Sequence, residues 1–127
     1  MHPDDLASIR RHLRRHRPDA IICCNDKTAA IFKRTLDLLG IRVPEDILLA
    51  GFDDVSVSNI MSPPLTTIHQ PCELIAKTAF DRLLARIADP DLSPAEILLN
   101  SKLIVRESTV RIDVNLKKTS KKEKHEH

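Results

Sequence analysis

The first half of the chain repeats apolar residues at the spacing of an α-helix in two places. The stretches 4–16 and 27–39 each carry an apolar residue at about every third or fourth position. The residues that form these two stripes are Leu6, Ile9 and Leu13 in the first, and Ala29, Phe32, Leu36 and Leu39 in the second. This spacing predicts two helices, each with one face against a core.

Two short runs in the same half, residues 20–24 and 47–52, are apolar on both faces. Such runs are typical of buried parallel strands, which lack the alternation of half-exposed strands. With helix 27–39 between them, the order is strand, helix, strand, and the crossover is long enough for parallel pairing. The pattern therefore predicts a right-handed βαβ unit and an α/β fold.

The second half of the chain consists of shorter segments that are separated by prolines. We expect a helical turn over residues 56–61 and a short strand over residues 65–69. Two further strands are expected at residues 97–100 and 103–107.

A longer helix is predicted directly after Pro71, because proline needs no N–H partner in a first helical turn. Its apolar row consists of Ile75, Ala79, Leu83 and Ile87. Beyond Asp113 the chain is polar, rich in lysine and without periodicity. That composition predicts a disordered tail.

Composition limits the classes of function that fit. The 127 residues suffice for one domain with a modest core, and aromatic residues make up only 2% of them. The core is therefore aliphatic, and few rings are available to stack on a sugar. The net charge of +2 does not by itself indicate nucleic-acid binding. Basic residues do cluster at 10–17 and 117–124. Such clusters can contact phosphate, but a solvated helix face and a solubilising tail are the more common roles.

The three cysteines are Cys23, Cys24 and Cys72. An odd count with two adjacent residues gives no disulfide framework and no zinc spacing. Reduced thiols suit a cytoplasmic protein, which is the expected location. We recognise no signal peptide and no apolar run of membrane-spanning length, so no membrane partner is expected.

Polar residues follow both predicted parallel strands. Asn25 and Asp26 come after the first strand, and Asp53 and Asp54 come after the second. In open α/β sheets, ligands bind outside the carboxyl ends of the strands. If the strands are neighbours, these side chains converge on one crevice, where they suit a ligand with several hydroxyl groups, such as a sugar.

Each of these residues except Asp53 has a ready structural explanation. Asn25 or Asp26 can cap helix 27–39, and Asp54 can cap the turn at residues 55–61. Asp53 ends a buried strand and has the weakest structural reason to be there. We therefore favour ligand contact most for Asp53.

Five sequence blocks resemble the effector-binding domain of LacI/GalR-type transcription regulators, and they occur in that family's order and spacing. The blocks are residues 18–26, 39–46, 51–54, 63–71 and 103–109. The resemblance implies the C-terminal part of a two-lobed, periplasmic-binding-protein-like (type I) domain, incomplete relative to the family. It also implies a small-molecule effector, with a carbohydrate favoured, and a homodimer.

The resemblance assigns roles by position. It implies that Asn25 and Asp53 contact the effector and that Gln70 is a hinge residue near the cleft. Asp26, Phe52 and Asp54 are secondary candidates. No catalytic residue, metal or cofactor is implied.

The resemblance also divides the chain. Residues 1–113 are expected to be a partial effector-binding domain and residues 114–127 a basic tail. The first part is expected to contain a lobe core at 18–70, a crossover helix at 71–88 and return strands at 97–107. Helix 27–39 and the segment 55–62 are expected to contribute to the dimer. DNA would be bound only through an N-terminal helix-turn-helix that these residues do not contain.

Two other classes of function remain open. One is a sugar-binding transport protein with the same two-lobed fold. The other is an enzyme or phospho-acceptor that uses Asp53 and Asp54 with a divalent cation. No glycine-rich phosphate loop, activated nucleophile or metal motif accompanies these aspartates, so this alternative is the weakest.

Overall fold

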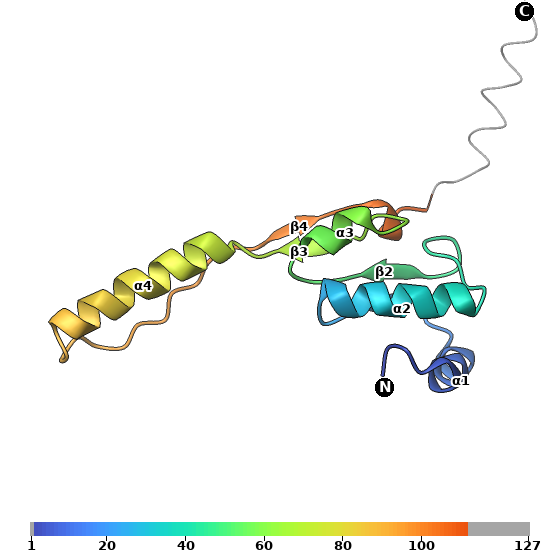
Figure 1. Ribbon diagram of the computed structural model, residues 1–127, viewed down its shortest axis with the longest axis horizontal. Helices are drawn as coiled ribbons and strands as arrows, with labels where there is room; N and C mark the ends of the chain where they lie inside the picture. Colours follow the sequence, from blue (N-terminus) through green and yellow to red (C-terminus); the bar gives the residue numbers. More distant parts are fainter. Residues whose placement is uncertain (1, 112–127) are drawn as a thin grey trace, which may run out of the picture.

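The computed structural model describes residues 2–111. Its regular elements, in chain order, are α1 (Leu6–His16), β1 (Ala20–Ile22), α2 (Asp26–Leu38), β2 (Leu48–Ala50), α3 (Ser56–Ile60), β3 (Thr67–His69), α4 (Cys72–Ala88), β4 (Lys102–Ile104) and a 3₁₀ turn, η1 (Glu107–Thr109). Figure 1 shows a body that contains all of these elements except α4, which extends away from it.

The predicted parallel βαβ unit is present. Strands β1 and β2 pair in parallel, with Ile21 opposite Leu49, and α2 forms the crossover between them. Two isolated parallel bridges, Ala50 with Thr66 and Asp53 with His69, then place the β3 segment alongside the end of β2. Strand β4 pairs antiparallel to β3. The sequence of neighbours is therefore β1, β2, β3 and β4.

Local sequence explains where α2 begins and ends. Asn25 has an extended backbone, and its side chain accepts a hydrogen bond from the Thr28 N–H at the first turn. At the other end, Gly40 adopts a positive φ of 72°, and the Ile41 N–H donates to the Leu36 carbonyl. This is the hydrogen bond of a Schellman ending, which favours glycine because that residue carries no Cβ.

The core is aliphatic, as the composition indicates. It contains one residue from α1, three from α2 and the central residue of β2, with others from the connecting segments. These residues are Ile9, Cys23, Ala29, Phe32, Leu36, Val43, Ile47, Leu49 and Leu65. Burial of this apolar surface holds α1 and α2 against the sheet, and each such aliphatic side chain contributes about 1.5–3 kcal/mol.

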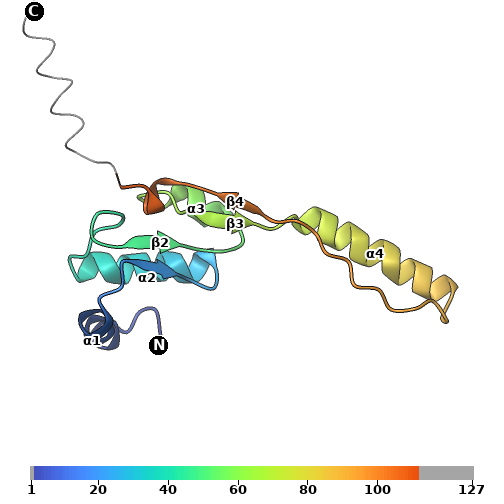
Figure 2. The ribbon, with the colours of Figure 1, turned by 180° about the vertical axis from the view of Figure 1, so that it is seen from behind.

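Helix α4 has no buried residue, and the segment that follows it runs back along the helix (Figure 2). The strand predicted at residues 97–100 is wrong, because β4 covers only Lys102–Ile104 and residues 91–101 have no regular structure. Ile97, Leu98 and Leu99 instead line a groove against α4. A strand forms only where a second backbone offers hydrogen bonds. Strand β3 offers them to Lys102–Ile104 and not to residues 97–100. The predicted tail at 114–127 lies outside the described residues.

No helix within residues 2–111 is both long enough and apolar enough to cross a membrane.

Gly51 lies where the backbone after β2 passes the first turn of α2. A Cβ atom added at Gly51 would collide with Oδ1 of Asp26 and would lie 2.8 Å from Cδ2 of Leu65. Asp26 and Leu65 are both fully buried, so neither can move aside. Glycine is therefore required here because of close approach rather than backbone conformation.

We predict that Gly51→Ala lowers the free energy of unfolding by about 3 kcal/mol, because it overpacks a buried site. The control is Gly40→Ala, where nothing lies within 4 Å of the added Cβ and only the positive φ is strained. That change should cost about 1 kcal/mol. Urea unfolding followed by circular dichroism measures both. Equal losses would show that Gly51 is not tightly packed.

Candidate functional site

Asp53 and Gln70 are in direct contact. The Gln70 amide nitrogen donates to Oδ1 of Asp53 at 2.6 Å, and the Asp53 N–H donates to the Ile68 carbonyl at 2.9 Å. Asp53 and Asp54 both have a positive φ, 109° and 57°. Such conformations cost non-glycine residues about 1–3 kcal/mol and are kept only where the surroundings enforce them. The chain therefore turns sharply after β2 and holds the Asp53 carboxylate beside the exit from β3.

Asn25 lies at the same edge of the sheet. The N–H of its neighbour Asp26 donates to the Phe52 carbonyl at 2.9 Å, so the carboxyl ends of β1 and β2 are adjacent. Side-chain Oδ1 of Asn25 caps α2 through the Thr28 N–H at 2.8 Å. Because Oδ1 is used by the cap, the amide nitrogen is the part of the Asn25 side chain that can bind a ligand. Phe52 is about one-third exposed beside this edge.

Asp26 is fully buried, and both of its carboxylate oxygens are bonded within the protein. Oδ1 accepts from the Thr67 hydroxyl at 2.6 Å, and Oδ2 accepts from the Val55 N–H at 2.9 Å. The Thr67 hydroxyl also accepts from the Asp54 N–H at 3.3 Å. Asp26 thus connects the first turn of α2 to Thr67 in β3 and to the Val55 N–H in the loop after β2. Through the Thr67 hydroxyl it is also linked to the Asp54 N–H. Its role as a secondary ligand residue stays a prediction.

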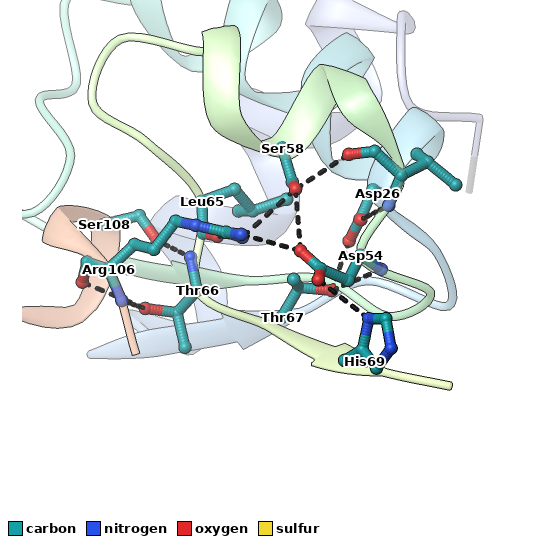
Figure 3. A network of polar contacts seen from close by, with 10 residues as sticks. Asp26, Asp54, Ser58, Leu65, Thr66, Thr67, His69, Arg106 and Ser108 are labelled. Atoms are coloured by element: carbon teal, nitrogen blue, oxygen red, sulfur yellow. Dashed lines mark hydrogen bonds and ion pairs between the residues drawn. The ribbon is translucent and has the colours of Figure 1, made fainter. Parts of the chain in front are cut away.

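Asp54 forms an ion pair with Arg106 in a network shown in Figure 3. Oδ1 of Asp54 accepts from the Arg106 guanidinium at 2.7 Å and from the Ser58 hydroxyl at 3.3 Å. Oδ2 accepts from Nδ1 of His69 at 2.9 Å. The expected cap of the turn at 55–61 by Asp54 is wrong, because Val55 is the N-cap of α3 and no side chain caps it. Asp54 contacts α3 only through the Ser58 hydroxyl, and the other bonds of its carboxylate go to His69 and Arg106.

Electrostatics at this pair favour the charged carboxylate. The side chains of Asp54 and Arg106 are 17% and 15% exposed, so solvent screens them little. The Arg106 guanidinium lowers the pKa of Asp54, and so does the hydrogen bond from His69. Partial burial acts in the opposite direction and raises this pKa. Arg106 also donates to the Leu65 carbonyl at 2.9 Å, which fixes the guanidinium in place.

The segment after β4 is attached to the sheet by side chains. The Ser108 hydroxyl donates to the Leu49 carbonyl at 2.6 Å and accepts from the Thr66 N–H at 2.8 Å. The Arg106 N–H donates to the Thr66 hydroxyl at 2.8 Å. Sequence reasoning did not assign roles to Thr67, Arg106 or Ser108. A lone arginine directly after the apolar run Leu-Ile-Val was the available signal for a partly buried ion pair.

The remaining reactive groups do not assemble into a second centre within residues 2–111. No group of three or more His, Cys, Asp or Glu side chains in that range is placed to hold a metal ion. Burial raises the pKa of the Cys23 thiol to about 11, so this cysteine stays protonated at neutral pH. Asp53, Gln70 and Asn25 are therefore the groups through which this edge of the sheet can bind a ligand, and their assignment stays a prediction.

Comparison with known proteins agrees with this geometry. Residues 2–109 match the periplasmic binding protein-like domain family. The chain belongs to this family. The predicted fold class is confirmed, and so is the resemblance to the effector-binding domains of LacI/GalR-type regulators.

Curated relatives are transcriptional repressors. The chain is 40% identical over 97 residues to the HTH-type transcriptional repressor PurR of Vibrio vulnificus (strain CMCP6), covering 76% of this chain and 29% of that protein. It is 44% identical over 94 residues to PurR of Yersinia enterocolitica, covering 74% and 28%. The chain thus spans less than a third of the length of these relatives.

Three solved structures with the same fold are complexes with small molecules. A CelR–cellobiose complex superposes with a TM-score of 0.73 at 35% identity, covering 81% of this chain and 32% of that one. A LacI family regulator from Enterococcus faecium with bound ribose gives 0.75 at 27% identity, covering 89% and 42%. The lac repressor dimer bound to operator and the anti-inducer ONPF gives 0.70 at 31% identity, covering 82% and 32%.

We predict that Arg106→Ala lowers the free energy of unfolding by about 2–3 kcal/mol at pH 7, since a charged group loses a mostly buried partner. The folded-state pKa of Asp54 is lowered below its usual value of 3.8. The stability that the pair contributes is therefore fully present above about pH 4 and is lost as the pH falls through the folded-state pKa. The gap between wild type and variant should shrink in acid.

Urea unfolding at pH 7, 5 and 3 measures this gap. Arg42→Ala is the matched control, because Arg42 pairs with Asp46 on an exposed turn. Exposed pairs contribute little, so the control should lose less stability. A gap between wild type and Arg106→Ala that widens on acidification would contradict the prediction.

Proposed function

We propose that this chain is the effector-sensing and dimerising portion of a LacI/GalR-type transcription regulator that works in the cytoplasm. Operator DNA is then bound through an N-terminal helix-turn-helix outside the residues present. The main support is the Asp53 carboxylate, held in a strained turn at the edge of the sheet where β1 and β2 both end. The repressor relatives favour a binding protein over an enzyme.

Asp53, Asn25 and Gln70 suit a ligand that offers both hydrogen-bond donors and acceptors. The Asp53 carboxylate accepts, the Asn25 amide nitrogen donates, and the Gln70 carboxamide can both accept and donate. A pocket with such fixed polar groups discriminates strongly against ligands that leave them unpaired. Phe52 lies beside them and can contribute apolar contact. Asp26 and Asp54 contribute indirectly through the loop that carries Asp53.

A carbohydrate is the effector class we favour. Hydroxyl groups on adjacent carbons match a carboxylate flanked by carboxamides. The cellobiose and the ribose bound in two structures of similar proteins support the choice. With only three phenylalanines and no tryptophan or tyrosine, this chain offers little ring surface for stacking on a sugar. Recognition by these residues therefore depends on hydrogen bonds.

The mechanism we propose is a shift between open and closed arrangements of two lobes. Gln70 lies between β3 and α4, where the chain leaves the body, and it bonds to Asp53. A ligand that contacts both Gln70 and Asp53 binds more tightly to the closed arrangement of the two lobes. It then shifts the population toward that state and changes the spacing of distant DNA-binding heads.

A homodimer fits the apolar residues exposed on the body. Leu38, at the end of α2, is 63% exposed, and Ile60, at the end of α3, is 81% exposed. Both lie in the segments from which the resemblance implies dimer contacts, residues 27–39 and 55–62. Burial of such side chains between two copies would stabilise the pair.

A sugar-binding transport protein is the second candidate, because the family to which the chain belongs is periplasmic binding protein-like. The coding sequence upstream of Met1 distinguishes the two. A helix-turn-helix in the same reading frame supports the regulator, and an export signal supports the transport protein.

We predict that sugars bind weakly or not at all to residues 1–127 alone, because these residues span less than a third of the matched repressors. Joining the chain to the upstream part of a complete effector domain should restore binding. In that protein, Asp53→Ala should weaken binding about 100-fold, since charge-assisted hydrogen bonds are lost. Isothermal titration calorimetry with ribose, cellobiose and lactose measures the effect.

The matched control is Asp37→Ala, which removes an exposed carboxylate on α2 that pairs with Lys33. It should leave the affinity unchanged. The site assignment is wrong if Asp53→Ala binds the sugar as tightly as the control does.

A further inference from the structure

Helix α1 carries a basic surface that the effector site does not use. Ala7, Arg10, Arg11, Arg14 and Arg15 line an open groove with a volume of about 420 Å³. Their spacing of three, four, seven and eight residues from Ala7 places all of them on one face of the helix. All four arginines are exposed. We define this set as the arginine face of α1.

The arginine face has no acidic counterpart in the described structure. Helix α1, Leu6–His16, contains no aspartate or glutamate, and none of its four arginines forms an ion pair or side-chain hydrogen bond within residues 2–111. Two other exposed cations, Arg42 and Lys77, each have a carboxylate partner four residues away. Like charges at this spacing repel, so the arrangement opposes helix formation. The helix dipole favours only the cations in its last turn.

We infer that the arginine face of α1 binds the phosphate backbone of nucleic acid without reading sequence. Each planar guanidinium can donate two parallel hydrogen bonds to a phosphate, which lysine cannot do. All four basic residues on this face are arginines. A row of exposed cations beside a groove suits a chain of regularly spaced phosphates, and each contact adds affinity that depends on salt.

The same structure argues against a lipid surface and an acidic protein. A membrane-binding helix needs an apolar face that can enter the lipid. In α1 that face points inward, because Ile9 is fully buried and Leu13 packs on the core. A protein partner usually buries an apolar centre surrounded by polar groups. The groove offers only Ala7 between the guanidinium groups, so charge supplies nearly all of the attraction.

This inference is independent of the effector site. In the proposed regulator it would add sequence-blind affinity to operator recognition by a separate head. Its test uses no sugar, so its outcome and that of the Asp53 experiment are distinguishable.

The test measures binding of the full 127-residue chain to a fluorescein-labelled 20-base-pair duplex of arbitrary sequence, by fluorescence anisotropy between 50 and 200 mM salt. The main variant replaces Arg10, Arg11, Arg14 and Arg15 with alanine. The control variant removes four exposed cations elsewhere, Lys27, Arg34, Arg86 and Lys102. The two variants have equal net charge, and both keep the lysine-rich residues at 117–124.

We expect the main variant to bind at least about tenfold more weakly than the control at 50 mM salt. Its slope of log affinity against log salt should fall by about 3.6, which is about 0.9 for each of the four phosphate contacts removed. Circular dichroism checks folding, which relief of arginine repulsion should not harm. The double variant Arg10→Gln/Arg11→Gln should give an intermediate slope and serves as a milder second test.

Three outcomes would overturn the inference. Equal losses in the two four-residue variants would assign the affinity to net charge alone. An unchanged affinity in the main variant would assign it to other segments. Binding of polyglutamate or of phosphatidylserine vesicles more tightly than the duplex would show that the face suits an acidic protein or a lipid surface instead.

Discussion

The buried carboxylate of Asp26 is the interaction on which the geometry of the candidate site depends. It begins α2, yet it bonds to Thr67 in β3 and to the Val55 N–H in the loop after β2. A buried charge is costly unless hydrogen bonds satisfy it, so the fold can keep this residue only if both partners stay in place. The absence of a side chain at Gly51 gives the carboxylate room. The bonds of Asp26 therefore help to fix the position of the loop that carries Asp53.

The same loop is held from the other side by segments distant in sequence. Asp54 bonds to His69 at the end of β3 and to Arg106 after β4. The two crossovers, which are the segment that leads into α4 and the segment that returns from it, are therefore bonded to one carboxylate. These contacts enforce the positive φ angles at Asp53 and Asp54, which are unfavourable in isolation. In the proposed regulator, a movement of either crossover would be transmitted to the residue next to the ligand contact.

Local patterns in the sequence predicted the elements well where one chain segment decides its own structure. The apolar stripes located α1 and α2, the two-faced runs located β1 and β2, and Pro71 marked the start of α4. The parallel pairing of β1 with β2, which brings positions 25 and 53 to one edge, was also predicted. The strand expected at 97–100 was wrong because strand formation depends on a partner that local pattern does not reveal.

The candidate site was predictable only in part, for the same reason. Asp53 was singled out from its position after a strand and Gln70 from the family resemblance, and the two are in contact. The bonds of Asp26 to Thr67 and of Asp54 to Arg106 join residues 41 and 52 positions apart, and periodicity carries no information at that separation. The position of Arg106 directly after an apolar run indicated a cation that needs an acidic partner. The sequence did not indicate that this partner is Asp54.

A double-mutant cycle between Asp26→Asn and Thr67→Val tests most directly whether this buried bond organises the loop. Free energies of unfolding would be measured by urea titration for both single variants and for the double variant. We predict a coupling of about 1–2 kcal/mol between the two sites, since each residue is the other's buried hydrogen-bond partner. Asp26→Asn combined with Arg34→Ala, an exposed residue of α2, should be additive. Additive losses for Asp26 and Thr67 would contradict the central role of their bond.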